Sequence, residues 1–377
     1  MTSPASTALI LSGGGARAAY QVGVLKAIGN WQGRGRGLPF QILSGTSAGA
    51  VNATVLAAWA SCLCKGVRQL EGVWSQFNTG QVFYADAGHI MKHLTKRLLH
   101  FFQADYAGQL PPSLLDPTPL QQLLANRIPF ARVDQQIRLG RLRALAVTAS
   151  SYSLRTSVSF FTATDDCHPW HRAKRLGIRT HLSEAHLLAS TSLPFLFPPV
   201  RIKHQYFADG TIHQLSPLSP VIHLGAERIL VVGTQHHHPP PPQARHHPPT
   251  AGTIAGHLLD TIFTDALNAD LERAWRINQT LEQVPPRRLK HMALRPLNIM
   301  VIQPSQNLDA LAARFYQHLP RAVRWLLSRM GVSDDAESSL LSYLLFESPY
   351  CRELIALGEA DAEAQKAALA PHLGILA

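Results

Sequence analysis

A serine between two glycines, in the segment Gly45–Gly49 (GTSAG), is the most reactive arrangement in this 377-residue chain. A serine hydroxyl is a weak nucleophile, so it needs exposure, a base and hydrogen-bond donors for the oxyanion. Glycines at these two positions allow the sharp turn between a strand and a helix that exposes the serine. The apolar run Phe40–Leu43 predicts such a strand, and the pattern of Ser47–Ala60 predicts the helix. Ser47 is therefore the candidate nucleophile of an acyl hydrolase.

Three consecutive glycines, Gly13-Gly14-Gly15, follow the short apolar run Thr7–Ser12, which predicts a strand. Backbone N–H groups at the end of this strand can point at a developing negative charge. A helix expected from Ala16 adds its dipole, and Arg17 adds a fixed positive charge. We expect this loop to lie beside the nucleophile and to bind the oxyanion.

The same loop has a rival interpretation as a nucleotide-binding site, because Gly13, Gly15 and Ala18 match a dinucleotide fingerprint. That fold needs an acidic residue about 20 positions later to hold the ribose. The first acidic residue of this chain is Glu71, and no Gly-Lys-Ser/Thr follows the loop to make a P-loop. Both nucleotide-binding interpretations therefore fail.

The residues alone leave the base open. Nineteen histidines permit a Ser-His-Asp triad, but α/β-hydrolases normally place several strands before the nucleophile, and here only two precede Ser47. The other candidate is Asp209, which follows the apolar run Tyr206–Ala208 and precedes Gly210. An ordinary carboxylate is a poor base for a hydroxyl, whereas an apolar cleft would raise its pKa toward a useful value. An Asp-Gly pair is otherwise a common surface turn.

Alternation of apolar runs and helical patterns predicts an α/β fold, with a central, mostly parallel sheet flanked by helices. Beyond the first two strand–helix units, we expect further strands at Leu142–Thr148, Ser157–Thr162, Arg228–Gly233 and Leu297–Ile302. The expected helices of the second half are Ile254–Leu281, Ala310–Met330 and the Ala-rich C-terminal 40 residues.

Residues 80–135 interrupt this alternation, and we expect a helical, lid-like insertion there. Between residues 91 and 102 basic side chains surround an apolar stripe, which favours a helix at a membrane surface, a lid, or a core helix with a solvated basic face. The expected division is a catalytic domain at 7–235, an extended Pro/His-rich loop at 236–250, and the rest of the sheet with a helical C-terminal region at 251–377.

Composition describes a folded, basic protein, with 46% hydrophobic and 16% charged residues, a formal net charge of +11 and a pI near 9.8. The charge favours anionic partners, either phospholipid head groups or nucleic acid. The basic residues are scattered and form no nucleic-acid-binding motif, so we expect no nucleic acid. The four cysteines are too few for a disulfide framework. Without a signal-peptide pattern or an apolar stretch of membrane-spanning length, the expected location is cytoplasmic, with peripheral contact at the membrane.

Taken together, three motifs resemble those of the patatin-like phospholipase family. They are the loop Gly13–Ala18, the elbow Gly45–Gly49 and the later Asp209-Gly210-Thr211, in the family's order. The segment Ala189–Pro199 also resembles the family's approach to its aspartate. Two residues depart from the pattern, since Ala18 replaces the loop's last glycine and Thr211 replaces a small residue after Asp-Gly.

The resemblance implies a three-layer patatin-like fold and a Ser47–Asp209 dyad that works without histidine, metal or cofactor. It also implies that Gly14, Gly15 and Arg17 shape the oxyanion hole together with the N–H of Ala48. The implied reaction is hydrolysis of acyl esters in phospholipids or lysophospholipids. The net positive charge would hold such an enzyme at an anionic membrane surface, and the oligomeric state stays open. Alternatives are a transacylase, thioesterase or glyceride lipase with the same dyad, and an inactive lipid-binding module, against which the intact dyad argues.

Overall fold

The computed structural model describes residues 6–86, 88, 113–236, 248, 250–289, 291–333 and 339–375. Its ten strands form one sheet, with bounds β1 Thr7–Leu11, β2 Ile42–Thr46, β3 Ala144–Ser151, β4 Thr156–Ala163, β5 Trp170–Arg172, β6 Arg175–Arg179, β7 Val200–Ile202, β8 Gln205–Asp209, β9 Arg228–Val232 and β10 Asn298–Ile302. The order across the sheet is β10-β9-β1-β2-β3-β4-β6-β5, and β8 pairs with both β3 and β7.

The half of the sheet that carries the first two motifs is parallel, as expected. Strands β10, β9, β1, β2 and β3 all run in the same direction. Beyond β3 the sheet is mixed, because β4 and β8 both pair with β3 in the antiparallel sense. The strands expected from the sequence are present with shifted ends, and β2 extends to Thr46 inside the elbow motif. Strands β5 to β8 were not expected.

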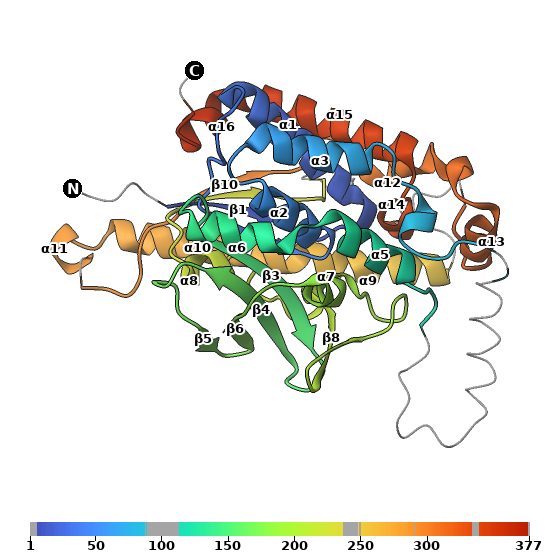
Figure 1. Ribbon diagram of the computed structural model, residues 1–377, viewed down its shortest axis with the longest axis horizontal. Coiled ribbons are helices and arrows are strands. Elements are labelled where there is room, and N and C mark those ends of the chain that lie inside the picture. Colours follow the sequence, from blue (N-terminus) through green and yellow to red (C-terminus); the bar gives the residue numbers. More distant parts are fainter. Residues whose placement is uncertain are drawn as a thin grey trace.

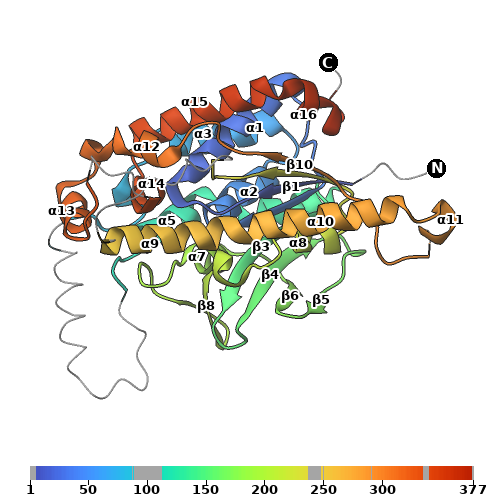
Figure 2. The ribbon, with the colours of Figure 1, turned by 180° about the vertical axis from the view of Figure 1, so that it is seen from behind.

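Helices cover both faces of the sheet (Figures 1 and 2). Their bounds are α1 Ala19–Gln32, α2 Ala48–Ala58, α3 Leu63–Trp74, α5 Thr118–Arg127, α6 Phe130–Arg138, α7 Glu184–Thr191, α8 Ser219–His223, α9 Ala251–Asp260, α10 Ala266–Glu282, α11 Pro286–Leu289, α12 Leu308–Ala313, α13 Arg321–Arg329, α14 Ser339–Leu344, α15 Ser348–Ala364 and α16 Lys366–His372. Short 3₁₀ turns lie at Gly15–Ala18, Thr79–Gln81, Gly210–His213 and Tyr316–His318, and a π-helical turn lies at Thr261–Asp265.

The two faces bury separate apolar cores, which makes the architecture three-layered. The larger core lies between the sheet and α1, α2, α3, α5, α6 and α12 to α15. The smaller core lies under α8 and α10, on the face seen in Figure 2, where α9 and α10 cross the sheet as one long rod. The expected α/β fold with flanking helices is confirmed.

Three expected helices differ in detail. The one expected at Ala310–Met330 is divided into α12, the 3₁₀ turn Tyr316–His318 and α13. The helix expected from Ala16 starts as the 3₁₀ turn, and the α-helix begins only at Ala19. The long helix expected at Ile254–Leu281 is divided by the π-helical turn into α9 and α10. The basic segment 91–102 and most of the Pro/His-rich loop lie outside the described residues. Within the described part, no helix is both long and apolar enough to cross a bilayer.

The C-terminal region joins the N-terminal part closely. β10 extends the same sheet beside β9, and α15 packs along α1. The Tyr20 hydroxyl donates a 3.0 Å hydrogen bond to Asp361, and Lys26 forms a 3.0 Å ion pair with Glu359. The C-terminal region therefore completes the fold that holds the first two motifs.

Candidate active site

Ser47 lies at the turn between β2 and α2, with backbone angles φ 54° and ψ −133°. Few non-glycine residues adopt such a conformation, and it costs on the order of 1–3 kcal/mol. The helix start also approaches β1 so closely that a Cβ atom at Gly49 would lie 2.2 Å from the Leu11 carbonyl oxygen. The structure thus has the strained strand–turn–helix elbow that the motif predicts, with Gly45 at its strand side.

A second serine holds this elbow in place. The Ser47 N–H donates a 2.9 Å hydrogen bond to Oγ of Ser190, whose hydroxyl donates a 2.7 Å bond to the Thr148 carbonyl. Ser190 is fully buried in α7. The sequence singled out the segment from Ala189 onward, but it assigned no role to Ser190. This contact ties the elbow to β3 and occupies the N–H of Ser47.

Strand pairing brings Asp209 to the elbow. On β3, Thr148 pairs with Thr46 of β2, and the next residue, Ala149, pairs with Asp209 of β8. The opposite edge of β3 is occupied along its whole length by β4, so β2 and β8 share one edge and meet end to end. Ser47 follows β2 directly, and it therefore meets Asp209, the last residue of β8.

Asp209 is a completely buried carboxylate. Its Oδ1 accepts hydrogen bonds from the N–H (3.0 Å) and the hydroxyl (2.7 Å) of Thr211. Burial raises its pKa to about 6, and hydrogen bonding with Ser47 and Thr211 opposes that rise. Among the described residues Oδ2 has no partner with full hydrogen-bond geometry, so the Ser47 contact is looser than that of Thr211. Thr211 thus holds Oδ1 of the carboxylate, whereas Oδ2 is left to accept a proton.

The glycine loop lies beside the elbow, because β1 and β2 are neighbours in the sheet. Gly15 has φ 53°, and a Cβ atom there would lie 2.3 Å from the Tyr343 carbonyl oxygen, so only glycine fits. Within the described part of the chain, the N–H groups of Gly14, Gly15 and Ala48 have no hydrogen-bond acceptor. Gly13 lies instead against Phe263, and its carbonyl accepts a 2.7 Å bond from Thr234.

The side chain of Arg17 is buried and directed at the C-terminal region. Its guanidinium lies 2.6 Å from Asp309 and 3.5 Å from Asp260, and it is centred 3.9 Å from the Tyr343 ring. It also donates to the Ser342 hydroxyl. Burial alone would lower the pKa of Arg17, but the tyrosine and the two aspartates more than offset this and raise it. Its charge is therefore already compensated by residues of the C-terminal region.

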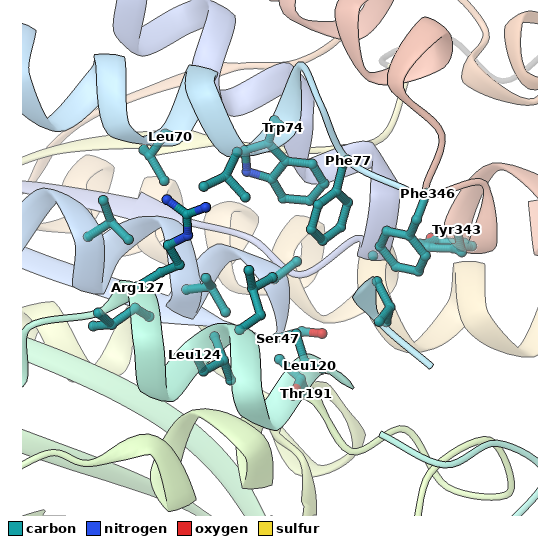
Figure 3. A pocket seen from close by; sticks show the side chains of 18 of the residues that line it. Ser47, Leu70, Trp74, Phe77, Leu120, Leu124, Arg127, Thr191, Tyr343 and Phe346 are labelled. Atoms are coloured by element: carbon teal, nitrogen blue, oxygen red, sulfur yellow. The ribbon is translucent and has the colours of Figure 1, made fainter. Parts of the chain in front are cut away.

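Ser47 opens into an apolar pocket between α2, α3, α5 and α14 (Figure 3). Figure 3 shows Ser47 between Arg127 at one end and Phe346 and Tyr343 at the other. The pocket is lined by Gly15, Ser47, Ala48, Val51, Val55, Gln69, Leu70, Val73, Trp74, Phe77, Val82, Leu120, Leu123, Leu124, Arg127, Ile128, Thr191, Leu193, Phe197, Tyr343, Leu344 and Phe346. This lining suits a hydrocarbon chain.

Histidine is absent from the pocket lining that the structure describes. The histidine closest to Asp209 in sequence, His213, lines a different hollow beside Ser150, and burial together with Lys174 lowers its pKa. Burial lowers the pKa of His186 to about 4. Across the described residues, no three His, Cys, Asp or Glu side chains gather as a metal site would require.

An α/β sheet with a strained serine elbow, a buried aspartate and an apolar pocket is the arrangement of a lipid acyl hydrolase. The sequence model of the family "Patatin-like phospholipase" matches residues 9–222, more than half of the chain. The protein therefore belongs to the patatin-like phospholipase family, as its motifs predicted.

Two solved structures are similar at low sequence identity. VipD from Legionella pneumophila is 14% identical with a TM-score of 0.34, over 93% of this chain and 67% of that protein. Human GIVD cytosolic phospholipase A2 is 10% identical with a TM-score of 0.45, over 98% of this chain. This chain spans only 60% of the human enzyme's length. No curated protein matches the sequence.

Proposed function

We propose that this protein hydrolyses acyl esters of phospholipids or lysophospholipids through a Ser47–Asp209 dyad and an acyl-enzyme. The observation that carries the proposal is the meeting of Ser47 with a buried, partly unpartnered carboxylate at an apolar pocket whose described lining holds no histidine. Family membership supports a lipid substrate.

In the proposed first step, Asp209 accepts the hydroxyl proton of Ser47 as the oxygen attacks the ester carbonyl. The oxyanion accepts hydrogen bonds from the unoccupied N–H groups of Gly14, Gly15 and Ala48. Asp209 then returns the proton to the leaving alcohol, which leaves an acyl-enzyme on Ser47. Water attacks this ester with Asp209 again as base, and Asp209 returns that proton to Ser47 Oγ as the fatty acid is released.

Burial of Asp209 suits this cycle, because a general base works best with a pKa close to the operating pH. A carboxyl with a pKa of about 6 is mostly ionised at neutral pH, yet it binds a proton more readily than an exposed aspartate. The bonds from Thr211 keep Oδ1 occupied, so proton transfer is assigned to Oδ2. Thr211, which departs from the family pattern, thereby orients the base.

The pocket supports assignment of the acyl chain to the space between α2, α3 and α5. Replacing the buried Leu124 by Trp would fill this space. We expect kcat/KM for long-chain esters to fall about tenfold or more, with short-chain esters nearly unaffected. The same change at the exposed Leu139 is the control. Equal losses for short and long chains would contradict this assignment.

The reaction is tested with phospholipids, lysophospholipids, glycerides and acyl thioesters, using wild type and Ser47→Ala. We expect fatty acid release from the phospholipid classes, abolished in Ser47→Ala while the circular dichroism spectrum is unchanged. Adding an alcohol acceptor separates hydrolysis from acyl transfer, because a transacylase would form the new ester instead of free acid. Lipid binding without product from any of these substrates would reject the hydrolase and leave the inactive lipid-binding module as the remaining hypothesis.

A further inference from the structure

Three turns gather at one end of the sheet, at residues 152–155, 173–174 and 203–204. The first joins β3 to β4, whose last paired residues are Ser151 and Thr156. The second is bound to it, since the Ser157 N–H donates a 3.1 Å bond to the Lys174 carbonyl. The third lies beyond the Ser151–Phe207 pair of β3 and β8. The β3–β4 and β8 ends project away from the helices in Figures 1 and 2.

These turns expose apolar and cationic side chains together. Tyr152 is 47% exposed, Leu154 46% and Tyr206 37%. We call these three residues, together with the exposed Arg155, Lys174 and Lys203, the turn surface. Segments 150–157, 170–177 and 200–207 contain no aspartate or glutamate. Within the part of the chain described, none of the three cations forms an ion pair.

The backbone presents these cations at fixed positions. Arg155, Lys174 and Lys203 have φ angles of 49°, 59° and 55°, a left-handed conformation that glycine and asparagine adopt more readily. Long cationic side chains thus occupy the tight turns where smaller residues would relieve strain. Because none of these three cations has an ion-pair partner among the described residues, the placement favours a role for their charges at the surface.

The turn surface and the pocket of Ser47 are linked through neighbouring residues. Tyr152 lines a hollow together with Phe195 and Phe197, and Phe197 also lines the Ser47 pocket. Phe195 between them is 80% exposed. From the other side, β8 leads directly from Tyr206 to Asp209. A surface that contacts these turns would therefore lie close to the elements that carry the dyad.

We infer that the turn surface docks the protein on an anionic lipid membrane. Tyrosine and leucine side chains at such a surface enter the interfacial region, while lysine and arginine bind acidic head groups. The inference rests on the proposed function, because it names the source of the lipid substrate. It assigns docking to turns of the sheet rather than to the basic segment that the sequence suggested.

The test measures sedimentation with phosphatidylcholine vesicles that contain or lack phosphatidylglycerol, in a Ser47→Ala background so that the lipid stays intact. We expect the triple variant Arg155→Gln, Lys174→Gln, Lys203→Gln to bind anionic vesicles about 10- to 100-fold more weakly. The control removes equal charge from exposed sites elsewhere, Lys65→Gln, Arg287→Gln and Arg288→Gln. We expect it to bind nearly as tightly as the parent.

Equal weakening in both triple variants would overturn the inference, because net charge rather than the turn surface would then decide binding. Undiminished binding by the first variant would overturn it too. With Ser47 intact, turnover of a short soluble ester should be the same in the first variant and wild type. If wild type itself hydrolyses no ester, the proposed function fails, while the vesicle comparison still decides docking.

Discussion

Two buried ionisable groups, Asp209 and Arg17, have opposite environments. Asp209 has hydrogen bonds but no cation against it among the described residues, and burial raises its pKa to about 6. Arg17 is equally buried, yet two aspartates, a serine and a tyrosine ring surround its guanidinium. The first group is destabilising when charged and available for chemistry, whereas the second is compensated and fixed. The unfavourable burial of a charge thus lies at the site, and the ion pairs and hydrogen bonds of Arg17 stabilise the surrounding fold.

The two environments also come from different parts of the chain. Ser47 and Asp209 lie within the family match at 9–222, together with every motif. The partners of Arg17 come from α9, α12 and α14, beyond that match. The glycine loop itself is bordered by Thr234, Phe263 and Tyr343. A C-terminal region without a motif thus determines the position of the loop that we assign to the oxyanion.

The largest expected effect comes from Asp209→Asn. We expect kcat to fall about a thousandfold or more, since the amide cannot accept the Ser47 proton. The free energy of unfolding of this variant should instead be higher than that of wild type at neutral and alkaline pH. Between pH 3.8 and about 6 the folded protein retains a proton that the unfolded chain has lost, so the free energy of unfolding falls as pH rises. At pH 8 the variant should be more stable than wild type by up to about 3 kcal/mol.

Ester hydrolysis and urea unfolding at pH 8 check this prediction. Asp270→Asn is the control, because Asp270 is also buried with a raised pKa but lies outside the Ser47 pocket. It should retain activity. Substantial turnover by Asp209→Asn would reject the dyad and return the search to histidine.

Arg17→Gln should lose both stability and activity, in contrast to Asp209→Asn. Removing the guanidinium leaves Asp309 and Asp260 without their cation, at a cost of about 3–5 kcal/mol. We expect kcat for a short soluble ester to fall at temperatures where the protein is still folded, because the glycine loop shifts. Thermal unfolding and kinetics below the transition measure the two effects. A folded variant with wild-type kcat would show that the loop holds its own geometry.

The smallest expected effect tests how the hydrogen bond from Thr211 sets the pKa of Asp209. Wild-type kcat/KM should rise with pH through a limb near 6, because Asp209 must be ionised to act as base. Thr211→Val removes the 2.7 Å bond that stabilises the carboxylate, which raises its pKa. The limb should therefore move to higher pH, with activity a few-fold lower at pH 6 and nearly normal at pH 8. A pH profile that superimposes on that of wild type would assign Thr211 a packing role only.

Local features of the site could be predicted from the sequence, because backbone geometry depends on neighbouring residues. Gly45 and Gly49 around Ser47 indicated the elbow, and three glycines after an apolar run indicated the loop. The strands β5 to β8 escaped prediction because they are short, and β5, β6 and β7 are partly polar and exposed. Ser190 escaped it because a serine within a helix carries no signal of its hydrogen bonds.

The sequence by itself predicted which residues could carry the chemistry, namely a serine on a sharp turn, glycines that expose N–H groups, and an aspartate before a glycine. Only the tertiary structure decided which of these residues lie next to one another. β3 pairs with β2 and then with β8 on one edge, and this register sets Asp209 against Ser47. Burial of Arg17 against Asp260 and Asp309 depends on helices folded from the other end of the chain. Such long-range pairings follow from strand register and packing, which local residue spacing does not specify.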